Sequence, residues 1–129
     1  MSGKQKKLII ICSVIAAVIA IAAGIMTYLL DYYPVDREAA KAASSGYCYV
    51  VEYGDDLKAY EPVGETNYGL IFYPGAKVEY TAYEPLMEWL AGEGVLCLLV
   101  KMPFNLAIFD KNAAFGMNNI YPNIEHWYI

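Results

Sequence analysis

A Pro-Gly-Ala turn after an apolar run is the first place in this sequence where chemistry is conceivable. Residues 68–73 read YGLIFY, and Pro74, Gly75 and Ala76 follow directly. In one interpretation, the backbone N–H near Ala76 is a donor to an anion or an oxyanion at the mouth of a site. In the other, proline stops a strand and glycine accepts a positive φ. Turn chemistry alone favours the second, and the spacing is not that of a dinucleotide-binding motif or a phosphate loop.

A second candidate stretch follows the apolar run 95–100. Residues 101–110 read KMPFNLAIFD, with Met102 and Phe104 at its start and Phe109 near its end. These side chains suit the lining of an apolar substrate pocket. They suit equally well a piece of core beneath a loop, and the sequence does not separate the two.

The remaining reactive side chains form no recognisable set. His126 is the only histidine, and it precedes the last apolar stretch, which places it at the opposite edge from the Pro-Gly-Ala turn. Four glutamates are expected on a solvated helix face: Glu79, Glu84, Glu88 and Glu93. The serines lie before, within or just after the first apolar segment: Ser2, Ser13, Ser44 and Ser45. We therefore expect no nucleophile–base pair in this sequence.

Metal and cofactor sites are not expected either. The three cysteines, Cys12, Cys48 and Cys97, lie in apolar stretches and show neither a CxxC pair nor a Cys/His spacing typical of zinc. They are interpreted as buried free thiols. No metal ligand and no cofactor is predicted.

The elements that must position the turn alternate between strand and helix. The runs 68–73 and 95–100 are continuously apolar, as strands covered on both faces are. Between them, residues 79–93 have the spacing of an amphipathic helix. A second helix is expected over about 110–120, followed by a strand at 126–129. The strands are therefore predicted to be parallel, with ligands at their carboxyl ends.

An antiparallel hairpin is expected before this β-α-β-α-β series. Its strands cover about 47–53 and 57–61, with Gly54-Asp55-Asp56 as the turn. Residues 31–45 form an alanine-rich linker with a short helix from Val35 to Ala43. The fold class is thus α/β, with a soluble domain over residues 46–129.

The amino-terminal segment is predicted to cross a membrane. No charged residue occurs from Leu8 to Leu30, a stretch long enough to span a bilayer as a helix. Residues 1–7 carry Lys4, Lys6 and Lys7 and should stay in the cytoplasm, which leaves the domain outside a cell membrane crossed once. A cleaved signal peptide ending near 20–22 is the alternative, but its apolar core is usually shorter. The net charge of −5 argues against a nucleic-acid partner.

The order of elements and two stretches resemble the α/β-hydrolase superfamily. The resemblance covers roughly residues 46–129, and the two stretches are Gly69–Gly75 and Val100–Asp110. The wider segment 69–110 is similar to a bacterial, often membrane-anchored branch related to dienelactone hydrolases. The resemblance implies that the strand ending HWYI leads into a G-x-S-x-G elbow, so that nucleophile, acid and histidine all lie beyond Ile129. It also implies oxyanion-hole donors at Gly75 and Ala76, with Ala76 preferred, although Pro74 stands where the family often has histidine.

Two functions follow as expectations. In the first, the chain is the amino-terminal portion of a membrane-anchored serine hydrolase that acts on an ester or similar acyl bond of a small molecule, and the portion alone is inactive. In the second, it is a non-catalytic, membrane-tethered module that binds a partner through an exposed sheet edge.

Overall fold

The computed structural model describes residues 2–44, 46–107, 110 and 112–129. The chain divides into two compact units, Met1–Asp31 and Tyr32–Ile129. The first unit consists of helix α1 (Gly3–Leu30). The second contains a sheet with its helices, and the two units are described separately below.

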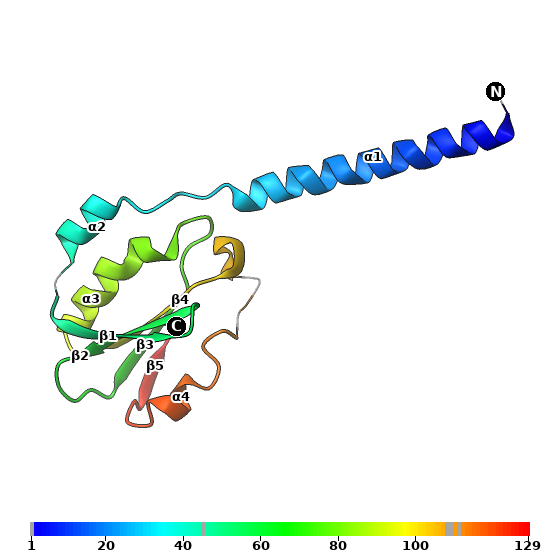
Figure 1. The fold of residues 1–129 in the computed structure, drawn as a ribbon. Coiled ribbons are helices and arrows are strands. Elements are labelled where there is room, and N and C mark those ends of the chain that lie inside the picture. The colour runs from blue at the N-terminus through cyan, green and yellow to red at the C-terminus, as the bar shows by residue number, and fades with distance from the viewer. Residues whose placement is uncertain (1, 45, 108–109, 111) are drawn as a thin grey trace. The chain divides into compact units, whose positions relative to one another are not determined.

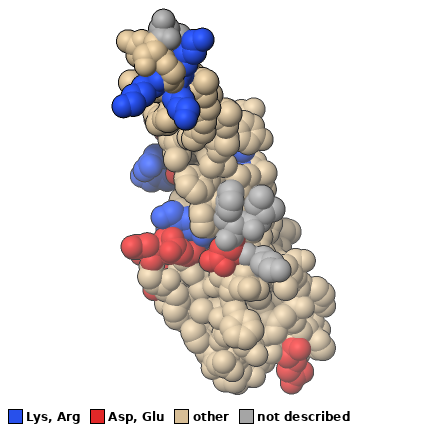
Figure 2. Space-filling model, turned by 90° about the vertical axis from the view of Figure 1, so that its right-hand side faces the viewer, with Lys and Arg blue, Asp and Glu red and all other residues tan. Residues whose placement is uncertain are grey.

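Helix α1 begins before the apolar segment because Ser2 caps it. The Ser2 hydroxyl accepts from the Lys4 N–H, and the Gln5 side chain accepts from the Ser2 N–H, which forms a capping box. Basic side chains gather around this end of the helix (Figure 2). No side chain of α1 is buried, and among the described residues it is the one helix long and apolar enough to cross a membrane.

The second unit is built on a mixed five-stranded sheet with the order β1-β2-β4-β3-β5 (Figure 1). The strands are β1 (Cys48–Tyr53), β2 (Leu57–Pro62), β3 (Tyr68–Phe72), β4 (Leu96–Val100) and β5 (His126–Tyr128). β1 pairs antiparallel with β2, and β2 pairs antiparallel with β4. β3 is parallel to both β4 and β5. The predicted fold class, a hairpin followed by parallel strands, is confirmed.

The helices expected over 35–43 and 79–93 are present, the second with a change of type in its first turn. α2 (Arg37–Ala43) begins at Asp36, whose carboxylate accepts from the N–H groups of Glu38 and Ala39. The predicted helix 79–93 divides into a 3₁₀ turn, η1 (Tyr80–Tyr83), and an α-helix, α3 (Glu84–Gly92). Pro85 fixes where α3 starts, because a proline ring fits only the first turn of a helix.

The helix predicted over about 110–120 is wrong for most of its length. Only α4 (Met117–Ile120) is helical, and residues 112–116 form turns. Gly116 precedes α4 with a φ of 88°, a left-handed conformation that interrupts a right-handed helix. Part of the prediction, at residue 111, lies outside the described residues.

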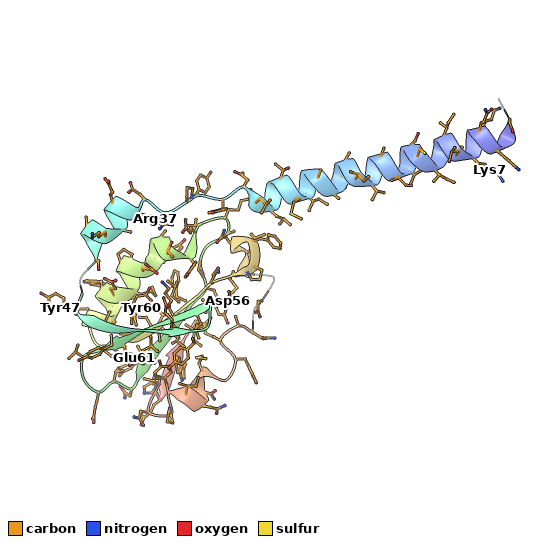
Figure 3. All side chains as sticks on the ribbon, in the orientation of Figure 1. Lys7, Arg37, Tyr47, Asp56, Tyr60 and Glu61 are labelled. Carbon is orange, nitrogen blue, oxygen red and sulfur yellow. The ribbon has the colours of Figure 1, made fainter. Side chains whose placement is uncertain are left out.

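Both faces of the sheet are covered. Every residue of β4 is buried, as its continuous apolar run predicts. α3 covers one face, where Tyr60, Met87, Ala91, Cys97 and Leu99 form a core cluster. The segment after β4 covers the other face, where the cluster is Leu57, Ala59, Leu98, Val100, Met102 and Ala114. Figure 3 shows Tyr60 and Glu61 projecting to opposite sides of β2, as successive strand residues do.

Candidate active site

The Pro-Gly-Ala turn lies at the carboxyl end of β3, the edge at which parallel sheets bind ligands. Val78 N–H donates to Gly75 O at 3.4 Å, which closes a four-residue turn over 75–78. Lys77 has a φ of 62°, the left-handed conformation that a type II turn requires at its third position. Ala76 therefore occupies the second position of this turn.

The backbone donors of this turn are available. Gly75 and Ala76 are both exposed. Within the described part of the chain, no hydrogen bond uses the N–H of either residue. Pro74 is buried and has no N–H to offer. An unused, exposed N–H at the end of a parallel strand is the geometry that an oxyanion donor needs.

Tyr83 also lies at the turn, and the sequence analysis did not single it out. A Cβ added to Gly75 would lie 3.0 Å from the Tyr83 hydroxyl oxygen, so glycine is what lets this phenol approach the turn. The Tyr83 ring packs against Phe72 of β3, with centroids 4.9 Å apart. A phenol O–H so placed is a further polar group at the carboxyl edge. Only the fold brings residue 83 back beside residue 75.

The loop after β4 supports the turn from one side. Lys77 N–H donates to Asn105 O at 2.9 Å. Asn105 belongs to the 3₁₀ turn η2 (Pro103–Asn105), in which Phe104 and Asn105 both have a φ of 53°. The two loops at the carboxyl ends of β3 and β4 are therefore joined by a main-chain hydrogen bond.

Three of the four glutamates expected on a solvated helix face have defined partners instead: Glu79, Glu84 and Glu88, the last of which accepts from the Ser44 hydroxyl. Glu79 precedes η1, and its carboxylate accepts from Val35 N–H at 3.0 Å and from the Thr81 hydroxyl at 2.9 Å. The hydrogen bond from Val35 lowers the pKa of Glu79; burial opposes this, and Thr81 and Arg37 add smaller lowering effects. Glu84 accepts from Lys58 Nζ at 2.8 Å. The prediction of a solvated face is wrong for these glutamates, because their carboxylates bind partners that lie far from them in the sequence.

The two predicted pocket residues occupy different environments. Met102 is 4% exposed and packs in the core cluster around Leu98 and Ala114. Phe104 is 43% exposed. Neither lines either of two described cavities, of about 780 and 410 Å³. Their role in a substrate pocket stays a prediction, and Phe109, named with them, lies outside the described residues.

The larger of two described cavities lies at the opposite, amino-terminal edge of the parallel strands. It has a volume of about 780 Å³ and is lined by the segments that precede β3 and β5 and by Leu96 of β4. At this edge the Tyr121 hydroxyl donates to Glu61 at 2.7 Å and lies 2.9 Å from the Tyr53 hydroxyl. His126 is there too, with its ring 5.3 Å from that of Tyr68. The cavity is thus remote from the turn at 75–78.

Among the described residues of the second unit, no serine or cysteine side chain lies at the turn. Ser2 caps α1, Ser13 lies within α1, and Ser44 follows α2 and donates to Glu88, while Ser45 lies outside the described residues. Burial raises the pKa of the Cys97 thiol to about 12, with Cys48 adding a smaller effect, so Cys97 is not a thiolate at neutral pH. In the same residues, no group of three His, Cys, Asp or Glu side chains is placed to hold a metal ion.

Comparison with known proteins identifies one family. Residues 69–129 match the model of the alpha/beta hydrolase family. The match begins in β3 and includes the turn at Gly75 and Ala76, α3, β4 and β5. No curated protein and no solved structure matches the chain. The family match supports the superfamily and a hydrolase-type fold for this segment.

Proposed function

We propose that the second unit is the amino-terminal part of a serine hydrolase domain that cleaves an ester or similar acyl bond in a small molecule. The family match and the order of the strands support this proposal. The observation that carries it is Ala76, an exposed residue in a turn at the carboxyl end of β3, whose N–H takes part in no hydrogen bond among the described residues. The branch related to dienelactone hydrolases is part of the proposal, which requires no metal and no cofactor.

The proposed chemistry is acyl transfer. A serine oxygen attacks the carbonyl carbon while a histidine takes the serine proton, and negative charge develops on the carbonyl oxygen. Ala76 N–H donates to that oxygen, with Gly75 N–H as its neighbour in the same turn. The second donor is the N–H of the residue after the serine. Each donor accelerates the reaction because it binds the negatively charged oxygen of the transition state more strongly than the neutral carbonyl of the substrate.

The nucleophile, acid and base of this reaction are proposed to lie in chain that follows β5. β5 is the direct parallel neighbour of β3, with Leu70 paired to Tyr128. Adjacent strands are about 4.8 Å apart, so a residue just beyond the carboxyl end of β5 lies close to the turn that ends β3. A strand-to-helix elbow at that point would place its serine beside Ala76 N–H.

The nucleophile is tested in the protein translated from the complete reading frame. We expect a glycine-flanked serine within about ten residues after β5, and covalent labelling of that serine by a fluorophosphonate. Residues 1–129 alone should not hydrolyse p-nitrophenyl esters above background. A reading frame without such a serine, or phosphonate-sensitive turnover by residues 1–129, would contradict the proposal.

The donor is tested with a matched pair of substitutions. Ala76→Pro removes the N–H at a turn position that proline favours, and Ala76→Gly keeps it. In the complete protein, Ala76→Pro should lower kcat by about 10²–10³, the usual effect of losing one oxyanion donor. Ala76→Gly should stay within a few-fold of the wild type. Equal kcat for the two variants would exclude Ala76 as a donor.

Membrane anchoring by α1 is the second part of the proposal. The lysines at its start are proposed to remain in the cytoplasm, with the second unit outside a cell membrane that α1 crosses once. A membrane-impermeant maleimide, applied to intact cells in a background with Cys12, Cys48 and Cys97 replaced by alanine, tests this. Glu65→Cys should be labelled and Ser2→Cys should not. The reverse pattern would overturn the orientation, and recovery of a shortened chain free in solution would indicate a cleaved signal peptide.

A further inference from the structure

The segment 33–35, called the strap here, lies beside the turn at 75–78. Tyr33 N–H donates to Lys77 O at 2.7 Å, and Glu79 N–H donates to Tyr33 O at 3.0 Å. These bonds make a parallel bridge between Tyr33 and Val78. The Tyr33 side chain is 74% exposed, so the strap holds the turn through its main chain.

Glu79 ties the same two segments together through its side chain. One carboxylate oxygen accepts from Val35 N–H at 3.0 Å, and the other accepts from the Thr81 hydroxyl at 2.9 Å. Glu79 thus makes three hydrogen bonds: its N–H and one carboxylate oxygen bind the strap, and the other carboxylate oxygen binds Thr81 of η1. An ionised carboxylate that accepts a backbone N–H makes a stronger bond than a neutral pair does.

The turn is held from two sides at its strained residue. Lys77 donates its N–H to Asn105 O and accepts at its carbonyl from Tyr33 N–H. A lysine with a φ of 62° adopts this conformation only where surrounding contacts fix it. The strap supplies one of the two main-chain contacts that do so. Its loss would let the peptide next to Ala76 relax.

We propose that the strap and Glu79 are positioning elements that fix the direction of the Ala76 N–H. This inference rests on the proposed function, in which that N–H is an oxyanion donor. Glu79 touches no substrate and acts only through the turn. The strap begins three residues after the end of α1, the proposed membrane anchor. The residues that connect α1 to the second unit therefore also orient the Ala76 N–H.

The first test uses amide hydrogen exchange of the full chain in detergent micelles and needs no activity. Glu79→Ala should speed exchange of the Val35 and Glu79 N–H groups about tenfold or more and shift the Ala76 amide resonance. Glu79→Gln keeps an acceptor oxygen and should restore most of the protection. Glu65→Ala removes an exposed carboxylate at the other end of β3 and is the matched control. Exchange at Leu98 in β4 should be the same in all variants, which excludes general unfolding.

A second pair of variants tests the main-chain bonds. Tyr33→Pro removes the N–H that reaches Lys77 O, whereas Tyr33→Ala removes only the exposed ring. Tyr33→Pro should shift the Ala76 and Lys77 amide resonances and speed exchange at Glu79, and Tyr33→Ala should not. If both variants, or neither, change these signals, the strap does not hold the turn.

The complete protein separates this inference from the proposed function. With a chromogenic ester, Glu79→Ala should lower kcat about tenfold or more with KM unchanged, and Glu79→Gln should recover it. A wild type without turnover would refute the proposed hydrolase, while hydrogen exchange still decides whether the strap holds the turn. Normal turnover with unchanged exchange in Glu79→Ala would refute the strap alone. Altered exchange with unchanged kcat would refute the positioning role.

Discussion

Replacement of Gly69 by alanine is the most direct test of how β5 joins the sheet. Gly69 of β3 pairs with Trp127 of β5, and the indole ring covers the position where a side chain would stand. A Cβ at residue 69 would lie 2.6 and 2.7 Å from two Trp127 ring carbons and 2.9 Å from the Ile124 Cγ2. Glycine is therefore a packing requirement of this strand pair.

The size of the effect follows from these distances. Ordinary contact begins at 3.4 Å, so the ring must retreat by roughly 0.8 Å, the difference from 2.6 Å. β5 has a ladder of only three residue pairs with β3, and a retreat of the ring pulls on all of them. Overpacking of this kind costs about 1–3 kcal/mol of the free energy of unfolding. We expect Gly69→Ala to lie in the upper part of that range.

Gly92→Ala is the matched control, with an effect of opposite sign. Gly92 is the last residue of α3, and an added Cβ would meet only the Tyr47 Cβ at 3.7 Å. Alanine in a helix is favoured over glycine by about 0.5–1 kcal/mol, so this variant should be slightly more stable than the wild type.

The assay is urea unfolding of the full chain in a mild detergent, followed by near-ultraviolet circular dichroism. The expected order of stability is Gly92→Ala, wild type, Gly69→Ala. Exchange of the β5 amides should increase in Gly69→Ala before that of the β4 amides. A Gly69→Ala variant as stable as the wild type, with β5 still protected, would refute the packing argument.

Three further predictions concern stability. Tyr121→Phe removes the hydroxyl that contacts Glu61 and Tyr53. It should lower the free energy of unfolding in urea by about 1–2 kcal/mol. An unchanged free energy of unfolding would show that these contacts do not stabilise the fold. The pKa of Cys97 is raised from 9.0 to about 12, so the stability that comes from its buried, neutral thiol is complete below pH 9.0 and is lost as the pH rises toward 12. Cys97→Ala should therefore flatten the alkaline fall in the free energy of unfolding. An unchanged slope of that free energy against pH would contradict this. The pKa of Glu79 is lowered from 4.5, chiefly by the bond from Val35, so its contribution to stability is present above pH 4.5 and is lost as the pH falls through the folded-state value. The protection factor of the Val35 N–H, which corrects for the intrinsic slowing of amide exchange in acid, should therefore fall in acid, and a fall of equal size in Glu79→Gln would contradict this.

The strands could be predicted because each is specified by its own residues. The continuous run of β4 demanded burial on both faces, and the sheet supplies it with every residue of β4 buried. The Gly54-Asp55-Asp56 turn fixed the hairpin, in which Tyr53 pairs with Leu57. A helix between two buried strands required parallel pairing of β3 and β4. Local chemistry was sufficient in each case.

The helix after β4 could not be predicted in the same way. Residues 110–120 have few strong helix breakers, and a single glycine at 116 is tolerated in many helices at modest cost. Here Gly116 adopts a left-handed φ, and Ala114 turns into the core beside Met102. That packing depends on the sheet residues around Leu98 and Val100, about which the sequence of residues 110–120 carries no information.

The contacts around the candidate site were also beyond sequence reasoning. The strap lies far from Glu79 in sequence, and its bonds to the turn are mostly between main-chain atoms, which carry no sequence signature. Tyr83 looked like one more apolar position of a helix. Its hydroxyl approaches the turn only because the chain reverses between β3 and η1. Topology could point to the carboxyl edge as the place for the proposed site, but the groups that hold the turn there could not be inferred.

The number of constraints on the turn bears on the choice between its two interpretations. An ordinary surface turn needs its closing hydrogen bond and a tolerant residue at the left-handed position, usually glycine or asparagine. This turn has lysine at that position and is held by the strap and by η2, while the Tyr83 hydroxyl approaches Gly75. These contacts fix the main chain on either side of Ala76, whose N–H makes no hydrogen bond to the residues that the structure describes and which is itself exposed. A rigid donor with no partner of its own is what an oxyanion site requires, so these contacts support the oxyanion role that we propose for the turn.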